Sequence, residues 1–190
     1  MSTLNALITA HAQIATIAQH LDGLSPAERV AECRALGGKQ LAQLWEVAKG
    51  GAQLALEDFV PAASEGTPVR FCGKNSLPAF THFEKHFVRK AGTIVGINVQ
   101  KLAFVTGPGY FTCDTMSDRA GEVLFDYTRV PSTPPVSDWP APRSNRSGCS
   151  FFVYRDMHDY NRRVSKDVVI GMATRLGKPA GQYYVLARAS

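Results

Sequence analysis

The sequence lacks the features that mark exported, membrane-spanning and zinc-stabilised proteins. Its four cysteines lie far apart and none belongs to a CxxC pair, which argues against a zinc ribbon, a thioredoxin-type site or a dense disulfide scaffold. The N-terminus carries no positive cluster, and no run of ~18 apolar residues follows, so neither an export signal nor a membrane-spanning helix is predicted. We therefore expect a soluble cytoplasmic protein with reduced thiols.

Familiar catalytic and nucleotide-binding motifs are also missing. The chain contains no GxSxG, no GxGxxG, no helix–turn–helix signature and no RNA-binding aromatic motif. Gly73-Lys74-Asn75-Ser76 resembles the end of a phosphate loop, but the first glycine is absent at the required spacing and Asn75 replaces the Ser or Thr. No cofactor is predicted.

What is present is the composition of a folded globular protein. The chain has 190 residues, of which 45% are hydrophobic and 19% charged, enough to bury a core without a disulfide or metal. Residues 1–60 hold four basic and six acidic side chains, a net of −2, and residues 61–190 hold seventeen basic and ten acidic, a net of +7. The basic excess favours acidic partners, although ordinary soluble proteins often carry a similar bias.

Apolar spacing predicts three helices in the N-terminal third. Residues 4–21 repeat at three- and four-residue steps, and residues 41–48 do the same before Gly50-Gly51. Between them Ser25-Pro26, with Glu28 three residues after the serine, predicts a capped helix start. Short connections make these helices antiparallel neighbours.

The remainder of the chain favours strands. A helix is expected at 76–90, from the spacing of its phenylalanines, and another at 153–164. Strands are expected at 69–72, 93–99, 101–106, 110–114, 122–130, 167–174 and 182–187, and a proline-rich loop at 131–148. The predicted fold is α+β: a helical segment over 1–60, then a domain over 66–190 in which a curled antiparallel sheet packs on one or two helices.

His82 and His86 are the first candidate site. On a helix they would project from one face, about one turn apart, and could line a pocket or share a metal with His158, Asp114 or Cys113. They could equally flank the phenylalanine stripe that anchors the helix. The predicted ligand-binding residues are His82, His86, Tyr110, Phe111, Cys113, Tyr127 and Trp139, and no metal is assigned to them.

A second candidate is an anion site. Lys74 precedes the predicted helix at 76–90, whose first amides would favour an anion. Arginines interleaved with tyrosines suit phosphate contact, although nearby aspartates would make ordinary surface pairs with them. The predicted anion-binding residues are Lys74, Arg143, Arg146, Arg155, Arg162 and Arg163.

Three functions follow from these patterns. The first is a binding module that holds a small apolar or amphipathic ligand, or a partner segment, between sheet and helix, with the 131–148 loop as a lid. The second is an enzyme that uses His82 and His86 as metal ligands or acid/base groups, with Cys113 or Asp114 nearby. The third is a nucleic-acid or anion binder that uses the arginines of 143–163.

Overall fold

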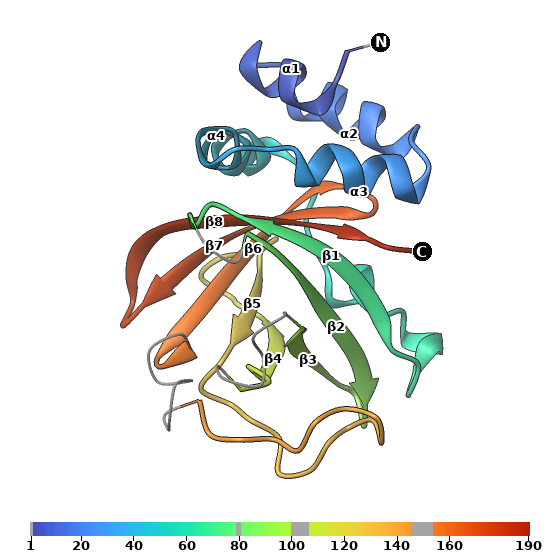
Figure 1. Ribbon diagram of the computed structural model, residues 1–190, viewed down its shortest axis with the longest axis vertical. Helices are drawn as coiled ribbons and strands as arrows, with labels where there is room; N and C mark the ends of the chain where they lie inside the picture. Colours follow the sequence, from blue (N-terminus) through green and yellow to red (C-terminus); the bar gives the residue numbers. More distant parts are fainter. Residues whose placement is uncertain (1, 79–80, 100–106, 146–153) are drawn as a thin grey trace.

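The computed structural model describes residues 2–78, 81–99, 107–145 and 154–190, and shows four helices followed by an eight-stranded antiparallel barrel (Figure 1). The α-helices are α1 (Leu4–Thr9), α2 (Ile14–Asp22), α3 (Pro26–Arg34) and α4 (Gly38–Val47). Short 3-10 turns follow at η1 (Ala48–Gly50), η2 (Leu56–Asp58) and η3 (Ala62–Ser64). The strands are β1 (Val69–Asn75), β2 (His82–Lys90), β3 (Thr93–Val99), β4 (Phe111–Thr115), β5 (Val123–Asp126), β6 (Met157–Ser165), β7 (Val168–Arg175) and β8 (Lys178–Arg188).

The helical segment follows its sequence signals. The predicted capping box forms: the Ser25 amide donates to Glu28 Oε2 at 3.0 Å, and the Glu28 amide donates to Ser25 Oγ at 3.4 Å. The helix predicted over 4–21 is instead two helices, because His11 adopts a φ of 55° in the left-handed region and ends the first.

Each strand pairs with the next along the chain, and β8 pairs with β1 to close the barrel. Two of the hairpins have two-residue turns, Ala91-Gly92 and Leu176-Gly177, in which both residues have positive φ. That is the type I′ geometry that matches strand twist. The α+β class and the last two predicted strands, which pair as an antiparallel hairpin, are confirmed. The curled sheet predicted to pack on a helix is in fact a closed barrel.

Two predicted helices are wrong. Residues 82–90 form β2, paired with β1 on one side and β3 on the other, and residues 157–165 form β6. The helix-like spacing of Phe80, Phe83 and Phe87 is outweighed by pairing along both edges, and Phe83 and Phe87 also share one face of a strand. The predicted cleft between sheet and 76–90 helix therefore does not exist. The predicted strand at 101–106 lies outside the described residues.

Helices α2, α3 and α4 pack on the outer face of the barrel, over β6, β7, β8 and β1, and α1 packs on these helices (Figure 1). Leu21, Leu41 and Leu44 are fully buried, in one cluster with Ile170 and Val185 from the outer faces of β7 and β8. Burial of such side chains stabilises the fold by roughly 1.5–3 kcal/mol each. The division into 1–60 and 66–190 stays a prediction, since this packing does not test whether either part folds alone.

Phenylalanines fill one half of the barrel interior. Phe59 precedes β1, and its ring lies 5.0 Å from that of Phe87 and 5.2 Å from that of Phe125, measured between centroids. The chain at 58–60 is held by arginines from the strand ends: Arg89 Nη2 donates to Val60 O at 2.7 Å and Arg188 Nη2 to Asp58 O at 2.5 Å. These hydrogen bonds hold Phe59 among the phenylalanines of the barrel interior.

Candidate ligand site inside the barrel

A cavity of about 210 Å³ is lined by inward-facing side chains of the barrel and lies next to the phenylalanine cluster. Its walls come from the ends of β1, β3 and β7, the beginnings of β2 and β6, the middle of β8, and the chain next to these strands. Most of the lining is apolar or aromatic, and four buried polar side chains, those of Lys85, Asn98, Tyr127 and Asp159, lie together in it. The full lining is Asn75, Leu77, Phe83, Lys85, Asn98, Tyr127, Tyr154, Met157, Asp159, Ala173, Gln182, Tyr183 and Tyr184.

Strand register brings these polar groups to one level of the barrel. Lys85 lies opposite Asn98 across the β2–β3 pair, and Asp159 lies opposite Phe125 across β5–β6 and opposite Ala173 across β6–β7. Side chains two residues apart on a strand share a face. Lys85 therefore points inward with Phe83 and Phe87, as the contacts of its amine confirm.

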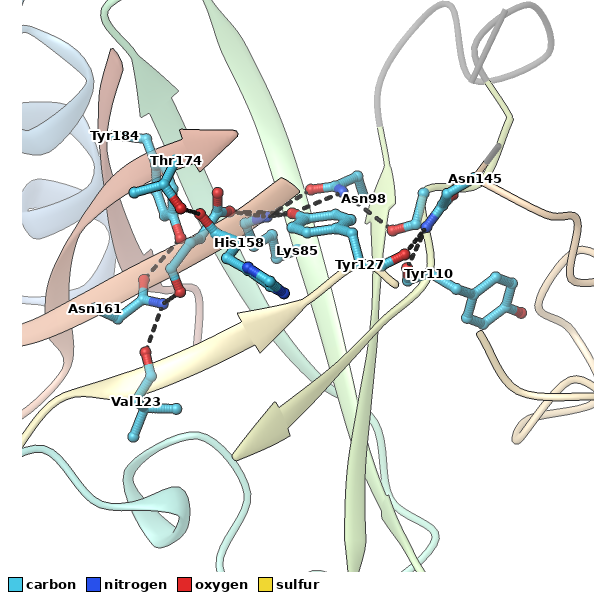
Figure 2. A network of polar contacts seen from close by, with 12 residues as sticks. Lys85, Asn98, Tyr110, Val123, Tyr127, Asn145, His158, Asn161, Thr174 and Tyr184 are labelled. Atoms are coloured by element: carbon cyan, nitrogen blue, oxygen red, sulfur yellow. Dashed lines mark hydrogen bonds and ion pairs between the residues drawn. The ribbon is translucent and has the colours of Figure 1, made fainter. Parts of the chain in front are cut away.

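Lys85 Nζ is held by hydrogen bonds inside the barrel. It donates to Asn98 Oδ1 at 2.8 Å and to the Tyr127 hydroxyl. Asn98 Nδ2 donates to the same hydroxyl at 3.1 Å and to Gly109 O at 3.1 Å. Figure 2 shows Lys85, Asn98 and Tyr127 converging in this way. The lysine side chain is only 2% exposed, so its amine is fixed and largely removed from bulk water.

Asp159 is the counter-ion of this amine. Its Oδ2 lies 3.5 Å from Lys85 Nζ and accepts a hydrogen bond from the Tyr127 hydroxyl at 3.2 Å. Its Oδ1 is buried and has no hydrogen-bond partner within the described part of the chain. A buried carboxylate oxygen of this kind is costly, which makes it a candidate acceptor for a donor brought by a ligand.

A second pair of polar groups supports the strand that carries Asp159. The Tyr184 hydroxyl donates to Asn161 Oδ1 at 2.7 Å, and Asn161 Nδ2 donates to Val123 O and Asp159 O, both at 3.1 Å (Figure 2). Tyr184 fits because Gly171 faces it across β7–β8: a Cβ at Gly171 would lie 2.2 Å from the Tyr184 Cζ. The wall of the cavity thus depends on one glycine.

Aromatic rings surround the amine. Lys85 Nζ lies 4.7 to 5.6 Å from the centroids of five rings, each within the range at which a cation is attracted to a π-face. The rings belong to Phe83, Phe111, Phe125, Tyr127 and Tyr184.

Burial shifts the pKa values of Lys85 and Asp159. Desolvation lowers the pKa of Lys85 to about 8, although Asp159 acts in the opposite direction by favouring the charged amine. Desolvation raises the pKa of Asp159, against the lowering effect of Lys85 and of the hydrogen bond from the Tyr127 hydroxyl. The two groups are coupled, so the pair titrates as a unit. Near neutral pH it holds a lysine that gives up its proton more readily than a surface lysine.

The structure separates the predicted ligand-binding residues. Tyr127 lines the cavity, and the Phe111 ring lies 4.7 Å from Lys85 Nζ. Cys113 is buried on the inner face of β4 but does not line the cavity, and burial raises the pKa of its thiol. His82 and His86 lie on β2 with the opposite parity to Lys85, and His86 Nε2 lies 2.9 Å from Glu84 Oε2.

The proline-rich loop packs on the outside of the barrel. Trp139 and Tyr110 are buried there in a cluster with Val88, Val95 and Ile97, and the Tyr110 hydroxyl donates to Pro140 O at 2.7 Å. None of the residues lining the cavity belongs to 131–145. The described part of this loop therefore covers the outer face of β2 and β3. The other residues of the predicted loop, 146–148, lie outside the description.

The predicted anion-binding residues do not form one site among the described residues. Lys74 lies on β1, and Arg143 lies in the proline-rich loop. Arg155 pairs with Asp156, with 3.1 Å between the arginine Nε and the aspartate Oδ2. Arg162 pairs with Glu122 at 2.8 Å and its guanidinium stacks on Trp45; Arg163 pairs with Asp58. Arg146 lies outside the described residues. Anion binding by this set stays a prediction.

The polar centre of the cavity was missed by the sequence analysis. Asp159 is one of the aspartates that the sequence predicts to pair with arginines at the surface, and no motif points to Lys85, Asn98 or Tyr184. Buried and less buried residues alternate along 157–163, as expected for a strand. The pattern is hard to recognise in the sequence because the buried positions 159 and 161 hold Asp and Asn, whereas a strand is normally identified by apolar residues at such positions.

Comparison with protein-family models, with curated proteins and with solved structures finds no match. Within the described ranges no three His, Cys, Asp or Glu side chains are grouped closely enough to hold a metal ion. In the same ranges, helices with the length and apolar character needed to cross a bilayer are not found. The site is therefore interpreted from its own geometry.

Proposed function

We propose that this barrel is a binding module that holds one small, mainly apolar molecule carrying a single oxygen-containing group. The observation that carries the proposal is the 210 Å³ cavity, in which aromatic and aliphatic walls surround Lys85, Tyr127 and Asp159. Ligand sites typically combine such walls with a few convergent polar groups, and an eight-stranded barrel is just wide enough for one small ligand.

The size of the cavity limits the ligand. A dry cavity of about 150 Å³ accepts benzene, so 210 Å³ suits a single ring with a short polar substituent. An alcohol or carbonyl oxygen would meet the Lys85–Tyr127 hydrogen-bond network, and a hydroxyl would donate to the unpartnered Asp159 Oδ1. A ligand with a full charge would disturb a pair whose own charges already balance.

Isothermal titration with benzyl alcohol tests the proposal. We expect saturable one-site binding with a Kd below about 1 mM, which corresponds to roughly −4 kcal/mol. Ala173 lines the cavity, so Ala173→Leu should fill it and weaken binding at least tenfold. Ala27→Leu, the same change at an exposed position of α3, should leave the affinity unchanged. Equal affinity in both variants, or no binding by the unmodified protein, would refute the proposal.

A further inference from the structure

We propose that Lys85 forms a reversible imine with a small apolar aldehyde or ketone bound in the cavity. This inference rests on the proposed function and narrows its ligand class. It is carried by geometry: the amine lines the cavity, is fixed by Asn98 and Tyr127, and is the nitrogen around which the aromatic rings converge.

The neighbours of the amine supply the proton transfers that imine formation needs. The Tyr127 hydroxyl accepts from Lys85 Nζ and donates to Asp159 Oδ2, so it connects the amine to the carboxylate. Through this connection, or directly across the 3.5 Å ion pair, the ammonium can pass a proton to Asp159 and become a nucleophile. The lowered pKa of Lys85, about 8, reduces the cost of that transfer.

The reaction balances without an oxidant or a reductant. The neutral Nζ attacks the carbonyl carbon, a C–N bond forms, and the carbonyl π pair moves to oxygen. That oxygen takes up the proton that the now positively charged nitrogen loses, which gives a neutral carbinolamine while Asp159 stays protonated. The carbinolamine hydroxyl would be a donor for Asp159 Oδ1, the buried oxygen that has no other partner in the described residues. Asp159 then returns its proton to that hydroxyl, the C–O bond breaks, water leaves and the C=N bond forms.

The iminium product keeps the positive charge that Asp159 and the aromatic rings stabilise. Overall, ammonium and carbonyl compound give an iminium ion and one water, so one positive charge remains beside Asp159 and within the five aromatic rings. The iminium is larger and less strongly hydrated than an ammonium, and a cation of that kind gains more from aromatic walls. The Lys85 side chain is only 2% exposed, which limits the access of bulk water to the imine and slows its hydrolysis.

Reductive trapping tests the inference on the full chain. The protein is incubated with benzaldehyde and sodium cyanoborohydride at pH 7, and the labelled lysines are identified by peptide mass spectrometry. The chain has eight lysines; surface amines with a pKa near 10.4 are almost entirely protonated at this pH. We expect Lys85 to carry at least ten times the label found on Lys39, which is exposed on α4.

Benzyl alcohol separates this inference from the proposed function, because it has the same ring and no carbonyl. An excess should suppress labelling of Lys85 at least fivefold and leave Lys39 unchanged, and Lys85→Met should remove the extra label while Lys39→Met does not. If benzyl alcohol binds but Lys85 is labelled no more than Lys39, the imine is refuted and the binding module stands. If benzyl alcohol does not bind and Lys85 is not labelled, both are refuted.

Discussion

The buried lysine predicts that the protein becomes more stable as the pH rises from 7 to 9. The pKa of Lys85 is about 8 in the folded protein, and an unfolded lysine has a pKa near 10.4. Between these values the unfolded chain binds more protons than the folded one, so the free energy of unfolding increases with pH. The full difference corresponds to about 3 kcal/mol, of which about 1 kcal/mol is gained between pH 7 and pH 9.

Urea denaturation at pH 7, 8 and 9 measures this gain when it is compared with the double variant Lys85→Met/Asp159→Asn. The variant has neither charge, and replacing both members of a buried pair is often nearly neutral. Burial raises the pKa of Cys33 to about 12 and also that of Cys113, which lowers stability above about pH 8.5. Both proteins share that effect, so their difference isolates the pair. If the free energy of unfolding of the unmodified protein, relative to that of the double variant, stays constant or falls between pH 7 and 9, the lowered pKa of Lys85 is refuted.

Two further variants test the packing that builds the site and the helical layer. Gly171→Ala should destabilise the protein by about 1–3 kcal/mol, since its Cβ would overlap the Tyr184 ring. Gly50→Ala is the matched control, because the added carbon meets open space there. Equal urea midpoints for the two variants would contradict the close packing of Tyr184 on Gly171. Ser25→Ala should cost about 1 kcal/mol by removing the α3 cap, measured by thermal unfolding. An unchanged melting temperature would show that the cap contributes nothing.

The sequence predicted those elements whose local signals agree with their surroundings. The capped helix at Ser25, the strand at 93–99 and the C-terminal hairpin all combine apolar periodicity with clear stop signals. It failed at β2 and β6, the two strands that carry Lys85 and Asp159. There the inner face holds polar residues, so the alternation expected of a half-buried strand is hidden. The turn after β2, Ala91-Gly92, also lacks the Asn-Gly or Asp-Gly pair that usually marks such a hairpin in a sequence.

The candidate site could be predicted only in part, because it depends on closure of the barrel. Tyr127 and Phe111 were expected to line a ligand site, and both lie around the Lys85 amine. Lys85 and Asp159 are 74 positions apart, and their pairing exists only once β1 to β8 have closed into a ring. Nothing local in the sequence distinguishes a lysine inside such a ring from one on the surface. Strand parity, by contrast, places His82 and His86 on the other side of β2.

The position of the bound molecule is the most direct test of the account, and two methionines report on it. Met157 lines the cavity, while Met172 lies on the outer face of β7 against the helices. With ¹³C-methyl-methionine labelling, titration of benzyl alcohol should shift the Met157 methyl signal saturably, give nuclear Overhauser contacts between it and the ligand ring, and leave Met172 unchanged. Contacts to Met172 instead, or no shift of Met157 at saturating ligand, would contradict a ligand site inside the barrel.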